Sequence, residues 1–191
     1  MPIESIANEV KMVFEDIDRD TAQFIHQTGM QCIDGCCHCC MRPDIEASPI
    51  EFLPLAFHLY SEGKAETFIE YLQNMGDPSF CPLLSYDAIE KKGLCKVYEY
   101  RPLICRLFGF SAMMDKNDQP ALVTCEPIKT KQADIYRHAT DRIREGLNVP
   151  VMKNYYFRLM GIHMNLALNR YPIQTAARMA IEEVLFYYLY R

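Results

Sequence analysis

The chain has 191 residues, of which 50% are hydrophobic and 24% are charged. This balance is typical of a globular protein and excludes a disordered or fibrous one. The formal net charge of −5 differs from the basic excess of general nucleic-acid binders, so we expect no nucleic-acid partner.

Nine cysteines in a chain of this length are too sparse for a disulfide scaffold, and an odd number cannot all pair internally. The first residues carry no secretory signal pattern, and no apolar run approaches the ~18 residues of a membrane span. We therefore expect a cytoplasmic protein without membrane contact. In a reducing compartment, surplus cysteines indicate metal or redox chemistry.

The N-terminal segment has the pattern of an amphipathic helix. Apolar residues between positions 3 and 25 recur three and four residues apart, and the helix is expected to end near Gly29. Residues 32–47 contain adjacent cysteines and an Arg-Pro pair, which suit neither a helix nor a strand period. We expect a loop there.

A helix start signal follows this loop. Ser48 is placed to cap the helix, Pro49 suits its first position, and Glu51 completes a capping box. A further helical stretch over 64–75 is expected to stop at the Gly-Asp-Pro sequence 76–78.

Residues 79–127 are interrupted by prolines and glycines, with short strands expected at 108–113 and 121–124. Helical patterns return near the C-terminus in three pieces, at about 130–147, 150–170 and 173–190. The sequence thus predicts a mainly α, single domain over 1–191. Helices at both ends would flank a central cysteine-rich, loop-rich metal-binding region with at most short strands. That region covers about 32–125, and the helical C-terminal part covers about 130–191.

The cysteines are clustered in a way that favours metal over disulfides. Five thiols lie within residues 32–40, and neighbouring cysteines do not readily reach disulfide geometry. Tight loops of this kind direct several thiolates at one centre, as soft metals require. For a single cysteine such as Cys125, the alternative is a small buried core residue. Eight cysteines are the candidate metal ligands: Cys32, Cys36, Cys39, Cys40, Cys81, Cys95, Cys105 and Cys125.

Two segments carry a resemblance to a known family. Residues 80–84 read Phe-Cys-Pro-Leu-Leu, and residues 95–106 read Cys-Lys-Val-Tyr-Glu-Tyr-Arg-Pro-Leu-Ile-Cys-Arg. They resemble the zinc- or iron-chelating CxxCxxCC proteins, whose signature includes C-x2-Y-x2-R-P-x2-C-R. In the first cluster, Cys32 lies one residue further upstream than that signature requires. The resemblance covers about residues 32–125 and implies metal binding by about eight cysteines.

The identity of the metal is left open by the spacing. Eight thiolates suit one or two iron–sulfur clusters, or one or two tetrahedral zinc sites. We place an iron–sulfur cluster first and zinc second. Arg101 and Arg106 flank Cys105 and are candidates to compensate the negative charge of such a centre, unless they pair with surface carboxylates. Tyr98 either donates its hydroxyl to a ligand or fills the core. Two residues of the first cluster stand in reserve as ligands: Cys37 and His38.

The functional expectation is a cytosolic metal-binding protein. Whether it is an enzyme is left open: one branch of the family is regarded as a flagellin lysine N-methylase, which makes a metal-dependent enzyme of that type the first alternative. The chain shows no glycine-rich nucleotide loop, because its eight glycines are isolated from one another. Surplus thiols would also suit a metal carrier or a redox-responsive adaptor.

Overall fold

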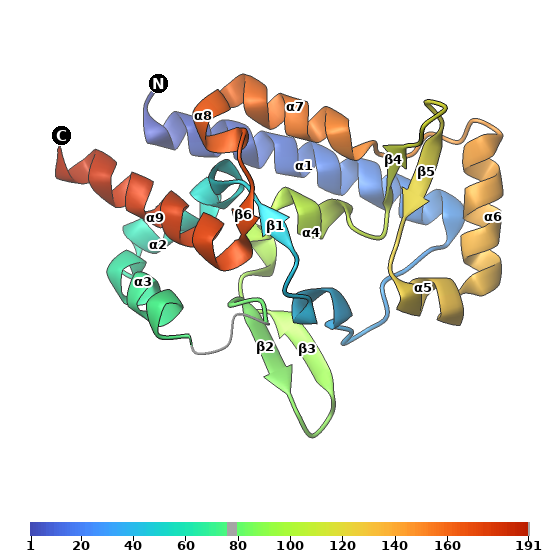
Figure 1. Cartoon of the computed structure of the whole chain (residues 1–191), viewed down its shortest axis with the longest axis horizontal. Helices are drawn as coiled ribbons and strands as arrows, with labels where there is room; N and C mark the ends of the chain where they lie inside the picture. Colours follow the sequence, from blue (N-terminus) through green and yellow to red (C-terminus); the bar gives the residue numbers. More distant parts are fainter. Residues whose placement is uncertain (76–79, 191) are drawn as a thin grey trace.

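Helices from both ends of the chain surround one long helix, α1 (Ile3–Thr28), in this computed structural model, which describes residues 1–75 and 80–190 (Figure 1). Apolar residues on one face of α1 are buried, as their spacing predicts. Gly29 ends the helix with φ of 74°, and its amide donates to the carbonyl of Ile25 at 2.8 Å. The prediction for this segment is confirmed.

The remaining α-helices are α2 (Leu53–Ser61), α3 (Ala65–Asn74), α4 (Leu103–Leu107), α5 (Glu126–Lys131), α6 (Ala133–Arg144), α7 (Met152–Ile162), α8 (Met164–Ala167) and α9 (Ile173–Leu189). Single 3₁₀ turns lie at His38–Met41, Pro49–Phe52 and Tyr98–Tyr100. The three antiparallel strand pairs of the described residues are β1 (Glu46–Ala47) with β6 (Tyr171–Pro172), β2 (Leu84–Asp87) with β3 (Lys92–Cys95), and β4 (Ser111–Met114) with β5 (Pro120–Val123). The mainly α architecture predicted from the sequence is confirmed.

The hydrophobic core has a larger and a smaller cluster. The larger cluster lies between α1, α2, α7 and α9. The smaller one joins the C-terminal end of α1 to β4, α5 and α6 through Phe24, Ala112, Ile128 and Ile143. Burial of such side chains contributes roughly 1.5–3 kcal/mol each, so both clusters contribute strongly to holding the helices together.

The start signal at Ser48 is confirmed. The main-chain amide and hydroxyl of Ser48 donate to Glu51 Oε1 at 2.7 and 2.8 Å, and Pro49 opens a 3₁₀ turn that continues into α2. The next predicted helix corresponds to α3, and its predicted stop at 76–78 lies outside the described residues.

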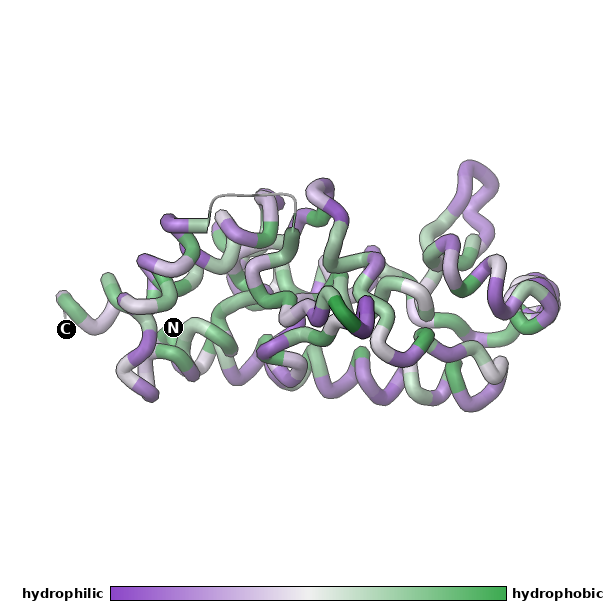
Figure 2. Tube along the Cα trace, turned by 90° about the horizontal axis from the view of Figure 1, so that it is seen from below, coloured by the Kyte–Doolittle hydropathy of each residue, from purple (hydrophilic) through white to green (hydrophobic). Residues whose placement is uncertain are grey.

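The irregular half and the C-terminal part contain more elements than the sequence predicts. The predicted strands at 108–113 and 121–124 correspond to β4 and β5, whose polar turn at 115–119 projects as a hydrophilic tip (Figure 2). The β2–β3 hairpin is not predicted. The helix predicted for 130–147 corresponds to α6, which a separate short helix, α5, precedes. The helix predicted for 150–170 is divided at His163 into α7 and α8.

The elements that concern the candidate site meet beside α1. The segment after α1 passes α5 and reaches the base of the projecting β2–β3 hairpin, where β1 and α4 also begin (Figure 1). Over residues 1–75 and 80–190, no helix combines the length and apolar character needed to cross a bilayer.

Candidate metal centre

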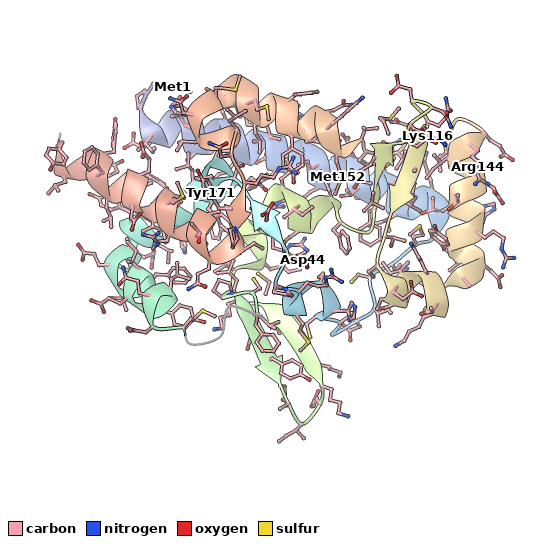
Figure 3. All side chains as sticks on the ribbon, viewed as in Figure 1. Met1, Asp44, Lys116, Arg144, Met152 and Tyr171 are labelled. Atoms are coloured by element: carbon pink, nitrogen blue, oxygen red, sulfur yellow. The ribbon has the colours of Figure 1, made fainter. Side chains whose placement is uncertain are left out.

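A cavity of about 1360 Å³ lies between α1, the segment that follows it, the β2–β3 hairpin and α4. Its lining brings together thiols that are far apart in the sequence. The cysteines that line it are Cys32, Cys36, Cys37, Cys39, Cys40, Cys81, Cys95 and Cys105. Side chains of this region are drawn in Figure 3, where Asp44 marks the chain just beyond the 3₁₀ turn at His38–Met41. All nine cysteines are free thiols.

The cysteine-bearing loop is tied to two other elements through its main chain. At its start, the Gln132 side chain forms two hydrogen bonds with the main chain of Gln31, at 3.1 and 2.6 Å. Further along, the amide of Gly93 in β3 donates to the carbonyl of Gly35 at 2.9 Å. These bonds fix a segment that has almost no regular structure of its own.

Cys37 faces the hairpin. It is only 7% exposed, and a Cβ built on Gly93 would lie 2.5 Å from its Cβ and 2.8 Å from its Sγ. The side chain therefore packs directly against the main chain of β3, a close approach that only glycine permits. Its neighbour His38 is exposed.

Cys39 and Cys40 bring two thiols of the cavity lining together. Their sulfur atoms are 3.9 Å apart, and the hydrogen bond between them lowers the pKa of Cys39 to about 6 while it raises that of Cys40. The amide of Cys81 donates to the carbonyl of Cys40 at 2.9 Å, which joins this turn to the segment before β2.

The cysteines from the second half of the site are more deeply placed. Burial raises the pKa of Cys81 to about 11, and burial also raises the pKa of Cys95 and of Cys105. A metal ion must therefore displace protons from these thiols when it binds, and its positive charge supplies the driving force.

Cys125 is the candidate ligand that is not among the residues lining the cavity. It precedes the first turn of α5, packs against the smaller core cluster, and is half-buried. Burial raises its pKa, and the negative charges of Cys36 and Cys39 raise it further. Cys32 is exposed. Partial burial of its thiol is the largest cause that raises its pKa, and the charges of Cys36, Cys39 and Cys125 raise it further.

Arg101 places a positive charge among the thiols. Its charge opposes the rise that burial causes in the pKa of Cys95 and Cys105, and it adds to the lowering of the pKa of Cys39. Its guanidinium carbon lies 3.6 Å from the centre of the Tyr98 ring. Tyr98 is 63% exposed, so the prediction that it fills the core is wrong; it covers Arg101 instead.

One buried polar atom without a hydrogen-bond partner belongs to a residue that lines the cavity. In the part of the chain that the structure describes, the buried unpaired side-chain atoms are Arg101 Nε, Thr124 Oγ1 and Tyr156 Oη. Of these residues, Arg101 lines the cavity, whereas Thr124 and Tyr156 do not. Because buried polar groups are normally paired, Arg101 Nε marks a place where a further group is expected.

Arg106 acts on the main chain of the site and not on its thiols. It forms an ion pair with Asp18 of α1, donates to the carbonyls of Glu99 and Arg101, and stacks over the Phe14 ring at 4.5 Å. The side chain is 5% exposed. It thereby fixes the turn from which Arg101 projects.

Sequence reasoning missed several residues that shape the site. Glu51 is fully buried; besides capping α2, its Oε2 accepts a hydrogen bond from the amide of Ile104 at 3.4 Å. Burial raises the pKa of Tyr156 in α7, and the charges of Glu51 and Cys105 raise it further. Only the capping pattern of Glu51 was visible in the sequence.

Cysteine thiols are suitable ligands for a soft metal or an iron–sulfur cluster, although their sulfur atoms do not converge on one point. Within residues 1–75 and 80–190, no three His, Cys, Asp or Glu side chains are grouped closely enough to hold a metal ion. Thiols on a tied loop need only rotate about their Cα–Cβ bonds to change the direction of Sγ. The clustered thiols and the unpartnered Arg101 Nε are the features that fit such a group.

Comparison with known proteins gives one match. A family model described as "CxxCxxCC: Putative zinc- or iron-chelating domain" matches residues 31–141, which is more than half of the chain. No match was found among curated proteins or among solved structures. The matched range includes every cysteine of the site, and the chain belongs to the CxxCxxCC family of zinc- or iron-chelating domains.

Proposed function

We propose that this chain is a cytoplasmic metal-binding protein whose clustered thiolates hold an iron–sulfur cluster, with zinc as the alternative occupant. The ligands are drawn from the eight cysteines that the sequence singles out. The nine free thiols suit a reducing compartment, in which disulfides do not form.

The half-buried side chain of Arg101, whose Nε is buried, carries the proposal. A four-iron cluster or a zinc ion with four thiolates has a net charge of about −2, which must be compensated where it is buried. Arg101 acts on three of the thiols, and its unpartnered Nε–H is available as a donor to sulfur. The family assignment supports zinc or iron chelation in general.

The number of thiols favours the cluster over the single ion. More than four thiols line the cavity, whereas one tetrahedral zinc ion takes four ligands. Iron–sulfur clusters take cysteine thiolates as their ligands, and eight thiols can supply two of them.

The test is anaerobic purification of the full chain, followed by a visible spectrum and by iron, sulfide and zinc analysis. We expect stoichiometric iron and sulfide with an absorption band of sulfur-to-iron charge transfer. Stoichiometric zinc without colour would select the alternative occupant. Protein that holds neither metal, and whose thiols stay freely titratable after reconstitution, would overturn the proposal.

A carrier function is the second candidate, because Cys32 and Cys39 are exposed at the rim of the cavity. Exposed thiolates allow an incoming thiol or chelator to attack the bound metal. A carrier should exchange its metal with a chelator in the folded state, whereas a structural centre should release it only on unfolding.

A further inference from the structure

We propose that the thiols form two neighbouring four-thiolate centres instead of one. This inference rests on the proposed function. The α5 set comprises Cys32, Cys36, Cys39 and Cys125. The hairpin set comprises Cys40, Cys81, Cys95 and Cys105.

The main-chain bonds of the loop separate its two ends. Its start is held at the end of α5 by the paired hydrogen bonds between Gln31 and Gln132. Its last turn is held beside the hairpin by the bond from Cys81 to Cys40. Figure 1 shows the same course, from the end of α1 past α5 to the base of β2 and β3. Thiols on the loop are thus distributed between two places.

The partners that lie outside the loop also divide into two groups. The cysteines of the hairpin set that follow the loop pack against the larger core cluster, whereas Cys125 packs against the smaller one. Among the electrostatic effects, Cys125 acts on Cys32, and Cys81 and Cys105 act on Cys40, whereas Cys39 acts on members of both groups.

Cys39 and Cys40 stand at the boundary. Cys40 belongs with Cys81 because their main chains are bonded. The charge of Cys39 acts on Cys32 and Cys125 but also on Cys81, Cys95 and Cys105, so Cys39 is assigned to the α5 set because that set otherwise has only three thiols. Adjacent cysteines that serve different centres have a parallel in two-cluster ferredoxins, in which one cysteine of a run ligates the other cluster.

Cys37 completes the division. Because its side chain is pressed against Gly93, it belongs to neither set, and the other eight thiols divide into four and four. A buried polar atom that lacks a hydrogen-bond partner accompanies each set. It is Arg101 Nε for the hairpin set, and Thr124 Oγ1, one residue before Cys125, for the α5 set.

The experiment is native mass spectrometry of anaerobically purified full-length chain, with Co²⁺ titration of the metal-free chain as the second measurement. We expect two centres per chain and a sulfur-to-cobalt absorption that rises up to two equivalents. Cys36→Ser with Cys125→Ser should leave one centre, and Cys81→Ser with Cys105→Ser should also leave one. The control, Cys37→Ser, should keep two.

The boundary residues give the sharpest comparison. Added to the Cys36→Ser, Cys125→Ser background, Cys39→Ser should leave the remaining centre in place, whereas Cys40→Ser should remove it. Far-UV circular dichroism checks that each variant is folded. The Co²⁺ titration of the wild-type chain tests the number of centres even if a variant fails to fold. A wild-type chain with a single centre, or equal loss from both boundary variants, overturns the division but leaves the proposed function intact. A wild-type chain that binds no metal overturns both.

Discussion

Cys37 and Gly93 are in such close contact that a Cβ on Gly93 would lie 2.5 Å from the Cβ of Cys37. This contact presses the cysteine-bearing loop onto β3, and the hydrogen bond from Gly93 to Gly35 holds it there. The position of the neighbouring thiols on the loop therefore depends on a residue that carries no thiol and no charge.

Gly93→Ala should move the loop and weaken metal binding. Overpacking of this kind costs roughly 1–3 kcal/mol, and the nearest atom that the new Cβ would meet is the Cβ of Cys37, which moves only together with its main chain. The measurements are the urea midpoint and the metal retained against a competing chelator. Gly161→Ala is the matched control: a Cβ there meets nothing within 4 Å, and it should stabilise α7 by up to about 1 kcal/mol. Equal behaviour of the two variants would contradict this interpretation.

The role of Gly93 shows why part of the site could not be predicted. Each cysteine was visible as a candidate ligand because a thiol is recognised by its residue type. The β2–β3 hairpin could not be predicted, because its four-residue strands are too short for a clear hydrophobic pattern of their own, and β3 contacts the loop from 31 to 41 through the main chain. For the same reason, Gln132 looked like any other helical glutamine.

The helical frame was predictable to a greater extent. The 3.6-residue period of α1 and the capping box at Ser48 are local signals, and both appear in the structure as predicted. The division between α7 and α8 was missed because it depends on His163, whose Nδ1 accepts a hydrogen bond from the Leu166 amide at 3.4 Å. No proline or glycine marks that position.

Arg101→Gln should reduce metal affinity. The substitution removes the positive charge that acts on Cys39, Cys95 and Cys105, and losses of 10–100-fold are typical when a group that supports metal ligands is replaced. Competition with a chromogenic chelator measures the effect. Arg144→Gln removes an exposed arginine of α6 and serves as the control. A variant at Arg101 with wild-type affinity would show that its charge does not support the centre.

Arg106→Met should lower stability more than it lowers metal affinity. The variant loses the ion pair with Asp18 and leaves the carbonyls of Glu99 and Arg101 without their donor, at a cost of roughly 3 kcal/mol. Arg19→Met breaks an exposed pair with Asp16 and should cost less than about 1 kcal/mol. Urea unfolding of both variants gives the comparison, and similar losses would mean that Arg106 is not a structural anchor.

Glu51 should make stability depend on pH. Burial raises its pKa above the usual value of 4.5, although hydrogen bonds from Ser48 and Ile104 and the charge of Arg170 oppose the shift. An acid that holds its proton more tightly when folded contributes stability at low pH, and this is lost as pH rises above the unfolded pKa.

Glu51→Gln cannot ionise, so the wild-type chain should lose stability relative to this variant as pH rises from about 5 to about 8. Tyr156 and Cys105 also interact with Glu51, but they are present in both proteins. The free energy of unfolding, measured in urea at several pH values on metal-loaded protein, tests this. A difference that is constant over the range would show that Glu51 does not titrate there.

Metal removal should loosen the centre without unfolding the protein. The larger core cluster is formed by α1, α2, α7 and α9, and its burial does not require the thiol loop to be ordered. This differs from a zinc finger, whose hydrophobic core is too small to keep it folded without its metal. After chelation we expect the far-UV circular dichroism to keep its helical form and the thermal midpoint to fall. Limited proteolysis should then cut within residues 31–41 and at the β2–β3 turn, whereas metal-loaded protein resists. Loss of the helical spectrum on chelation would mean that the two core clusters cannot hold the fold alone.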